Sequence, residues 1–198
     1  MVDVIIDEFK DGREQIRDIK AIKGIMIHRV GVDIQAGFVI GYDAPSICDA
    51  FLGRDERWPT VAKATGGQNA YTFFVGGNLG PNELDGMVWQ ALNIGEVGHH
   101  GLRFSRSHLG IALIGDFRAR PPSERQWLAA VDLCADLGLL LGIKPRDIVG
   151  HGEVDGAGAT TEGDGAGADH LLDAEAAEQR HERVDLLLGA AVLDDDGL

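Results

Sequence analysis

The stretch Gly24-Ile25-Met26-Ile27-His28-Arg29-Val30 is a short apolar run that opens with glycine and places a histidine near its end. Its length and composition predict a buried β-strand. Asp147-Ile148-Val149-Gly150-His151 predicts a second short strand, again ending on a histidine. Because a strand end is rigid, we expect His28 and His151 to project from the margin of a sheet as candidate ligands. The alternative is that each is an ordinary hydrogen-bonded histidine at that margin.

The strongest helix signal lies between Ser123 and Leu141. Ser123 and Gln126 form a capping box at its start, and Gly142 terminates it. Apolar residues recur every three or four positions, which gives this helix one buried face. Further strands are predicted over residues 69–76, 86–92 and 109–114. The first two form a hairpin. Strands interleaved with a long helix predict an α/β fold, in which helices flank a mixed central β-sheet.

The composition excludes several classes of protein. The chain has 198 residues and a net charge of −14, which disfavours a nucleic-acid partner because phosphate backbones need clustered cations. No apolar run approaches the roughly 20 residues of a membrane helix. The acidic start has no cationic region, so we expect no secretory signal peptide and a cytoplasmic location. We also expect the protein to be a monomer. The two cysteines, Cys48 and Cys134, are far apart and are expected to be free thiols.

The last part of the chain has a different composition. Residues 156–198 contain 11 of the 32 acidic residues and only two of the 18 cations, and they are built mainly from Ala, Gly, Asp, Glu and Leu. This shift divides the chain into a folded domain, residues 1–155, and an acidic segment, residues 156–198. We expect the second part to be a Gly/Ala-rich loop followed by a C-terminal helix or tail.

Six segments, read in order, carry a resemblance to a known family. They are GIMIHRV (24–30), AYTFFV (70–75), DGMVWQAL (85–92), GHHG (98–101), SHLGIALIGDF (107–117) and IVGHGEV (148–154). Together they resemble the zinc-dependent N-acetylmuramoyl-L-alanine amidases and peptidoglycan recognition proteins, including phage endolysin amidases. The resemblance covers roughly residues 20–155 and implies a single amidase-type domain, which we assign to residues 1–155.

The resemblance also implies roles for individual residues. His28 and His151 would bind zinc, for which neutral imidazole is a preferred ligand. Tyr71 would be catalytic, because a phenol near the metal can donate to a developing oxyanion, although an aromatic side chain in a strand can equally be core. His99 matches a histidine of the wall that binds substrate, whereas His100 and His108 match no role and are expected at the surface or rim.

The third zinc ligand of the family is a cysteine or aspartate in a Thr-x-Cys-Pro-Gly or Thr-Asp-Pro-Gly turn. This chain instead has Thr160-Thr161-Glu162-Gly163-Asp164. The alignment assigns the ligand position to Glu162, with Asp164 as the competing carboxylate, and both can bind zinc. The other interpretation is that both are solvated. Thr160 would assist the transition state if Glu162 is the ligand. Some members carry a glutamate base where this chain has Ala112.

The activity implied by the resemblance is hydrolysis of the amide bond between N-acetylmuramic acid and L-alanine in peptidoglycan or muropeptides, with Zn²⁺ as cofactor. An endolysin of this kind would be released to the cell wall by a holin. The alternative is a non-catalytic module that binds peptidoglycan or muropeptide and has lost its third zinc ligand. A third possibility is a chain whose acidic tail is a replacement and which has lost both activities.

Overall fold

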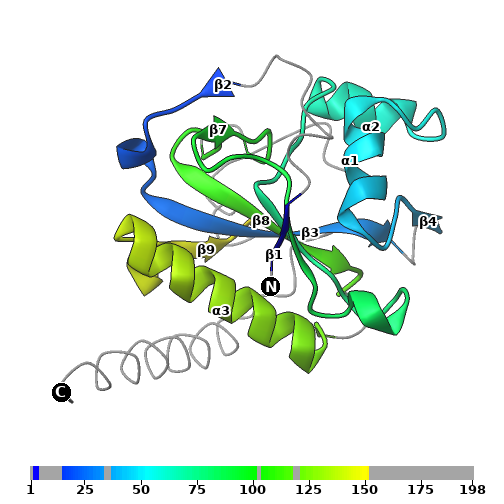
Figure 1. Cartoon of the computed structure of the whole chain (residues 1–198). Helices are drawn as coiled ribbons and strands as arrows, with labels where there is room; N and C mark the ends of the chain where they lie inside the picture. The colour runs from blue at the N-terminus through cyan, green and yellow to red at the C-terminus, as the bar shows by residue number, and fades with distance from the viewer. Residues whose placement is uncertain (1, 5–14, 34–36, 102–103, 118–120, 152–198) are drawn as a thin grey trace.

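The computed structural model describes residues 2–4, 15–33, 37–101, 104–117 and 121–151. The helices and strands of this part are connected in the order shown in Figure 1. They are β1 (Val2–Val4), β2 (Gln15–Ile16), the 3-10 helix η2 (Ile19–Ala21), β3 (Gly24–Asp33), β4 (Phe38–Val39), α1 (Ala44–Leu52), α2 (Pro59–Thr65), β5 (Phe73–Val75), η3 (Asn82–Leu84), β6 (Val88–Gln90), β7 (Glu96–Val97), β8 (His108–Gly115), α3 (Glu124–Leu141), η4 (Pro145–Asp147) and β9 (Ile148–Gly150).

A mixed sheet organises the described part of the chain. Its strands follow the order β1-β6-β5-β8-β3-β4, and β9 also pairs with β3. β3 runs parallel to β8 along one edge, while its other edge is shared by β9, which is parallel, and β4, which is antiparallel. The predicted hairpin is confirmed, because β5 and β6 pair antiparallel. β2 and β7 form a separate two-stranded sheet.

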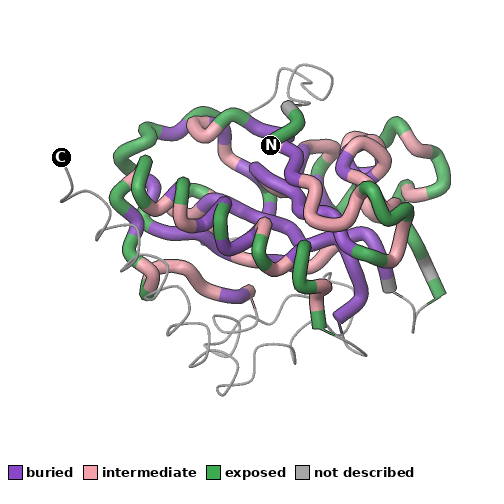
Figure 2. The backbone as a smooth tube through the Cα atoms, turned by 60° about the horizontal axis from the view of Figure 1, so that its bottom comes forward, coloured by how far each residue is buried: buried purple, intermediate pink, exposed green. Residues whose placement is uncertain are grey.

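Side chains alternate between the two faces of this sheet, and each face builds its own core. Ile111 and Leu113 of β8 pack in the cluster that contains α3. Their neighbours Ala112 and Ile114 pack in the cluster that contains α1. The sheet therefore lies between α3 on one face and α1 on the other, with its strands largely buried (Figures 1 and 2). This arrangement confirms the predicted mixed sheet flanked by helices.

α3 is anchored to the sheet by a buried amide. The Ser123 hydroxyl accepts a hydrogen bond from the Gln126 backbone N–H at 3.1 Å, as expected of a helix cap. The Gln126 side chain does not return to Ser123, so the expected reciprocal capping box is wrong. Instead its Nε2 donates to the carbonyls of Val75 and Ile114 at 3.0 and 3.1 Å. These carbonyls belong to β5 and the neighbouring β8, and the side chain fixes α3 over both strands.

Other sequence predictions can be compared directly with the structure. The helix predicted from residue 123 to 141 is α3, and it ends at Gly142 in the left-handed conformation with φ of 69°. The strand predicted over residues 69–76 is shorter, because β5 spans only Phe73–Val75. Cys48 and Cys134 are free thiols, as predicted, and lie in the two different cores. In the described part of the chain, no helix has the length and apolar character needed to cross a membrane.

Candidate functional site

The register around β3 brings two of the predicted site residues together. Ile27 of β3 pairs with Gly150, the last residue of β9, so His151 continues the chain beside His28. The two imidazole rings lie 4.6 Å apart between centroids. On the other edge of β3, His28 pairs with Ala112 of β8. β3 continues to Asp33, so the expectation that His28 lies at a strand end is wrong.

Tyr71 is the third predicted residue in this cluster. It comes two residues before β5, and the following N–H, that of Thr72, donates to the Gly110 carbonyl at 2.9 Å. The Tyr71 ring lies 5.0 Å from the His28 ring and 5.6 Å from Phe74, measured between centroids. Tyr71 therefore has one side against the apolar core and one side against His28, in keeping with both the catalytic and the packing role considered for it.

His100 also belongs to this cluster, contrary to the expectation that it lies at the surface or rim. It is only 7% exposed, and its Nδ1 lies 3.1 Å from Nε2 of His28. Its Nε2 lies 3.2 Å from the backbone carbonyl of His108. A β-carbon at Gly110 would approach the His100 ring to 2.8 Å, so only glycine at this position of β8 admits the ring.

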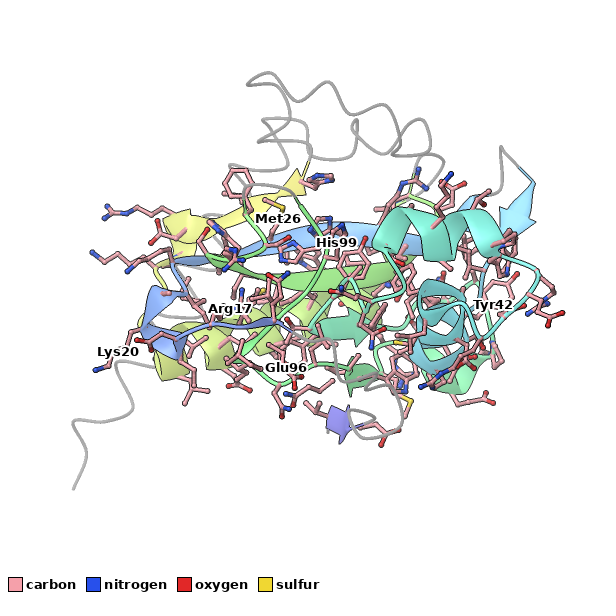
Figure 3. The ribbon with its side chains drawn as sticks, turned by 90° about the horizontal axis from the view of Figure 1, so that it is seen from above. Arg17, Lys20, Met26, Tyr42, Glu96 and His99 are labelled. Atoms are coloured by element: carbon pink, nitrogen blue, oxygen red, sulfur yellow. The ribbon has the colours of Figure 1, made fainter. Side chains whose placement is uncertain are left out.

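His99 points away from this contact. Its side chain is exposed, while its backbone N–H donates to the Asn69 carbonyl at 3.1 Å. The same loop passes close to β3, because a β-carbon at Gly101 would lie 3.6 Å from the Met26 sulfur. Met26 and His99 are labelled in Figure 3. An exposed ring beside a site is compatible with a role in binding substrate, which stays a prediction. His108 is half-buried and contributes its backbone carbonyl rather than its ring.

Burial keeps the imidazoles of His28 and His100 neutral. Desolvation holds the pKa of His28 well below its usual range, and the neighbouring rings of His100 and His151 lower it further. Burial also lowers the pKa of His100 to about 4, against the opposing effect of its hydrogen bond to the His108 carbonyl. Both rings are therefore uncharged at neutral pH, and an uncharged imidazole is the form that binds a metal ion.

Arg17 binds the backbone of the turn that precedes β8. It follows β2 directly, is 8% exposed and is labelled in Figure 3. Its guanidinium Nη1 donates to the carbonyls of Ser105 and His108 at 2.6 and 2.8 Å, and its Nε donates to that of Ile94 at 3.4 Å. One side chain thus holds three backbone carbonyls, and the His108 carbonyl accepts from both Arg17 and His100.

The donor chemistry of this cluster fits zinc, although the described residues do not complete a metal site. Imidazole nitrogens are ligands that zinc prefers, and His28 on β3 lies beside His151, which directly follows β9. Within the described ranges, no group of three His, Cys, Asp or Glu side chains could hold a metal ion. The remaining candidates, Thr160, Glu162 and Asp164, lie outside the described residues, as does the predicted boundary between residues 155 and 156.

Comparison with known proteins identifies the family of this chain. The sequence matches the N-acetylmuramoyl-L-alanine amidase family over residues 18–165. The chain belongs to this amidase family. The matched range includes His28, Tyr71 and His151, and it extends over the segment that contains Glu162 and Asp164. A search of curated protein sequences gives no match.

Solved structures of amidases and recognition proteins share the fold. The chain is similar to the Ph2119 endolysin of a Thermus scotoductus bacteriophage (18% identity, TM-score 0.60, 91% of this chain and 98% of that chain). It is also similar to the amidase LysC from Clostridium intestinale (15% identity, TM-score 0.54, 96% of this chain and 97% of that chain). A third similar structure is that of a point mutant of Drosophila PGRP-LB in complex with tracheal cytotoxin (20% identity, TM-score 0.51, 75% of this chain and 78% of that chain). At these identities the similarity establishes the fold.

Sequence reasoning missed Arg17, His100 and Gly110. The segment before residue 24 is polar and is typical of a loop or short helix, which gives no reason to expect a buried guanidinium. The GHHG segment holds two adjacent histidines, and nothing in it alone indicates which one turns inward. Gly110 is a usable signal, because glycine inside an otherwise apolar strand indicates the close approach of another group.

Proposed function

We propose that this member of the amidase family hydrolyses the amide bond between N-acetylmuramic acid and L-alanine in peptidoglycan or muropeptides, with Zn²⁺ as cofactor. The observation that carries the proposal is the convergence of His28, His151 and Tyr71, with ring centroids 4.6 and 5.0 Å from that of His28. Three residues far apart in the sequence meet at this sheet, and two of them carry imidazole nitrogens that can bind zinc.

In this proposal His28 and His151 hold the metal, and Glu162 or Asp164 supplies the third ligand. Support for a third ligand in this segment comes from the family match, which extends through residue 165. When bound, zinc supplies a Lewis acid that activates water and polarises the scissile carbonyl. Residues 156–198 would then contribute to the site despite their separate composition.

Tyr71 would act on the substrate rather than on the metal. Its ring packs against Phe51 and Phe74, at centroid distances of 5.9 and 5.6 Å, which restricts the direction in which the phenol points. A fixed phenolic O–H can donate to the oxygen that gains negative charge as water adds to the carbonyl. The amide C–N bond then breaks, and the products are the carboxylate of the lactyl group and the free amino group of L-alanine. Thr160 would assist this step if Glu162 is the ligand.

The proposed substrate rests on the family and on its relatives. The structure of a Drosophila peptidoglycan recognition protein of this fold was solved in complex with tracheal cytotoxin. A chain that binds muropeptide without cleaving it would be a recognition module. A chain that binds none would fit the third possibility, a tail that has replaced the functional one.

The experiment measures zinc content and muropeptide hydrolysis in the purified full-length chain. We expect about one zinc per chain, and we expect loss of that zinc when His28→Ala and His151→Ala are combined, because one remaining ligand cannot hold the ion. Unchanged zinc in the double variant would refute the assigned ligands. Glu162→Ala and Asp164→Ala form a matched pair. Substitution of the true third ligand should weaken zinc binding by orders of magnitude, whereas substitution of the other residue should not.

A further inference from the structure

The hydrogen bonds around His28 have a fixed direction. A backbone carbonyl can only accept, so Nε2 of His100 donates to the His108 carbonyl oxygen across 3.2 Å. A neutral imidazole has a single N–H, which leaves Nδ1 of His100 as an acceptor. Across 3.1 Å, Nε2 of His28 must therefore be the donor. Nδ1 is then the nitrogen of His28 that keeps a lone pair.

We infer that His100 is a positioning residue for the metal site, which fixes His28 as its Nε2–H tautomer and reserves Nδ1 for the ion. This inference rests on the proposed function. Metal-binding histidines commonly donate their second N–H to a carbonyl, carboxylate or water, and that bond sets the tautomer and the ring orientation. Here another histidine takes the place of the usual acceptor.

Close packing and hydrogen bonds hold the His100 ring in place. Its ring lies so close to Gly110 that a β-carbon there would be 2.8 Å away, and the same β-carbon would lie 3.2 Å from Tyr71. The carbonyl that receives its Nε2–H is itself held by Nη1 of Arg17 at 2.8 Å. The chain of contacts therefore runs from Arg17 through the His108 carbonyl and His100 to His28.

The same contacts argue that His100 acts through His28 rather than as a ligand. Both of its ring nitrogens already have partners, His28 at Nδ1 and the His108 carbonyl at Nε2. Among the described residues, it does not complete a group of three that could hold a metal. Substitution can distinguish a ligand from a positioning residue. A positioning residue needs only a hydrogen-bond acceptor at this atom, whereas a ligand needs an atom that binds zinc.

The test compares His100→Ala with His100→Asn in the full-length chain. The Asn Oδ1 lies the same number of bonds from the backbone as the His Nδ1, so it can accept the His28 N–H, whereas an amide is a poor zinc ligand. We expect His100→Ala to weaken zinc affinity by about 10- to 100-fold, the usual cost of losing such a partner. We expect His100→Asn to keep most of the zinc affinity that His100→Ala loses. Affinity is measured by competition with a chelator, and thermal unfolding checks that each variant folds.

A second measurement does not depend on any variant. Long-range ¹H–¹⁵N NMR of the metal-free wild-type chain should show His28 protonated at Nε2, and added zinc should shift its Nδ1 resonance. Protonation at Nδ1 would overturn the inference, as would an affinity of His100→Ala equal to that of the wild type. Equal losses in both His100 variants would make His100 a ligand and would also overturn it. Failure of the proposed function looks different, because the wild-type chain would then bind no zinc while its His28 tautomer stayed as assigned.

Discussion

Acidification from pH 7 to pH 5 should destabilise the metal-free protein through its buried histidines. Burial lowers the pKa of His100 to about 4, below the roughly 6.5 expected in the unfolded chain. Between these values the unfolded chain binds more protons, so stability is complete above about pH 6.5 and is lost as the pH falls toward 4. The pKa of His28 is shifted in the same direction and adds to the effect.

The size of the His100 contribution follows from the two pKa values. At pH 5 the unfolded ring is almost fully protonated, while the folded ring with its pKa of about 4 is still mostly neutral. The linkage relation then gives a loss of about 2 kcal/mol in the free energy of unfolding between pH 7 and pH 5. Other groups also titrate in this range, so the informative quantity is the difference between the wild type and a chain that lacks this ring.

Urea unfolding at pH 7 and pH 5, with a chelator present, measures this difference. His100→Asn should lose about 2 kcal/mol less than the wild type on acidification, because its amide does not titrate. His99→Asn is the matched control, and it should keep the full pH dependence because the His99 ring faces water in the folded chain. If the wild type and His100→Asn lose equal stability between the two pH values, the His100 ring is not buried as a neutral group and the reasoning fails.

Three further predictions follow from contacts in the sheet and the site. Tyr71→Phe should lower muropeptide turnover by roughly 10- to 1000-fold with zinc content unchanged, and wild-type turnover would make Tyr71 a packing residue only. Gln126→Leu should lower the free energy of unfolding in urea by about 2–4 kcal/mol, because the carbonyls of Val75 and Ile114 lose their donor. Arg125→Leu, on the exposed side of α3, should change it by no more than about 0.5 kcal/mol, and equal effects would contradict the role of Gln126. Burial raises the pKa of Cys48, and that of Cys134 to about 12, so a thiol reagent at pH 8 should modify neither in the native protein and both after unfolding.

The main elements could be predicted because their signals are local. Ser123 and Gly142 bound α3, and the apolar run from Gly24 defines most of β3. α1 also has a readable start, since Asp43 caps it by accepting from the Ser46 N–H at 2.8 Å and a proline occupies the first turn. That signal predicts a full helix, whereas the residues around Cys48 taken alone indicate only a helical turn.

The site was only partly predictable, because its assembly depends on register. The resemblance named His28, Tyr71 and His151, but only the pairing of Ile27 with Gly150 explains why the two histidines meet. The inward turn of His100 depends on the space at Gly110 and on a carbonyl held by Arg17. These conditions come from segments distant in the sequence, and no local pattern around residue 100 contains them.

The two histidines of the pair, His28 and His151, lie on segments that are held by the sheet to different extents. Of the described strands, β9 pairs with β3 alone, whereas β3 is also bonded to β8 along eight residue pairs. Short edge strands open at a fraction of the free energy of global unfolding, so β9 should exchange its amide protons well before the inner strands do. His151 can therefore separate from His28 while the core stays intact. An ion bound to both rings would link β9 to β3. Amide exchange in β9 should then be slower with the ion bound than without it.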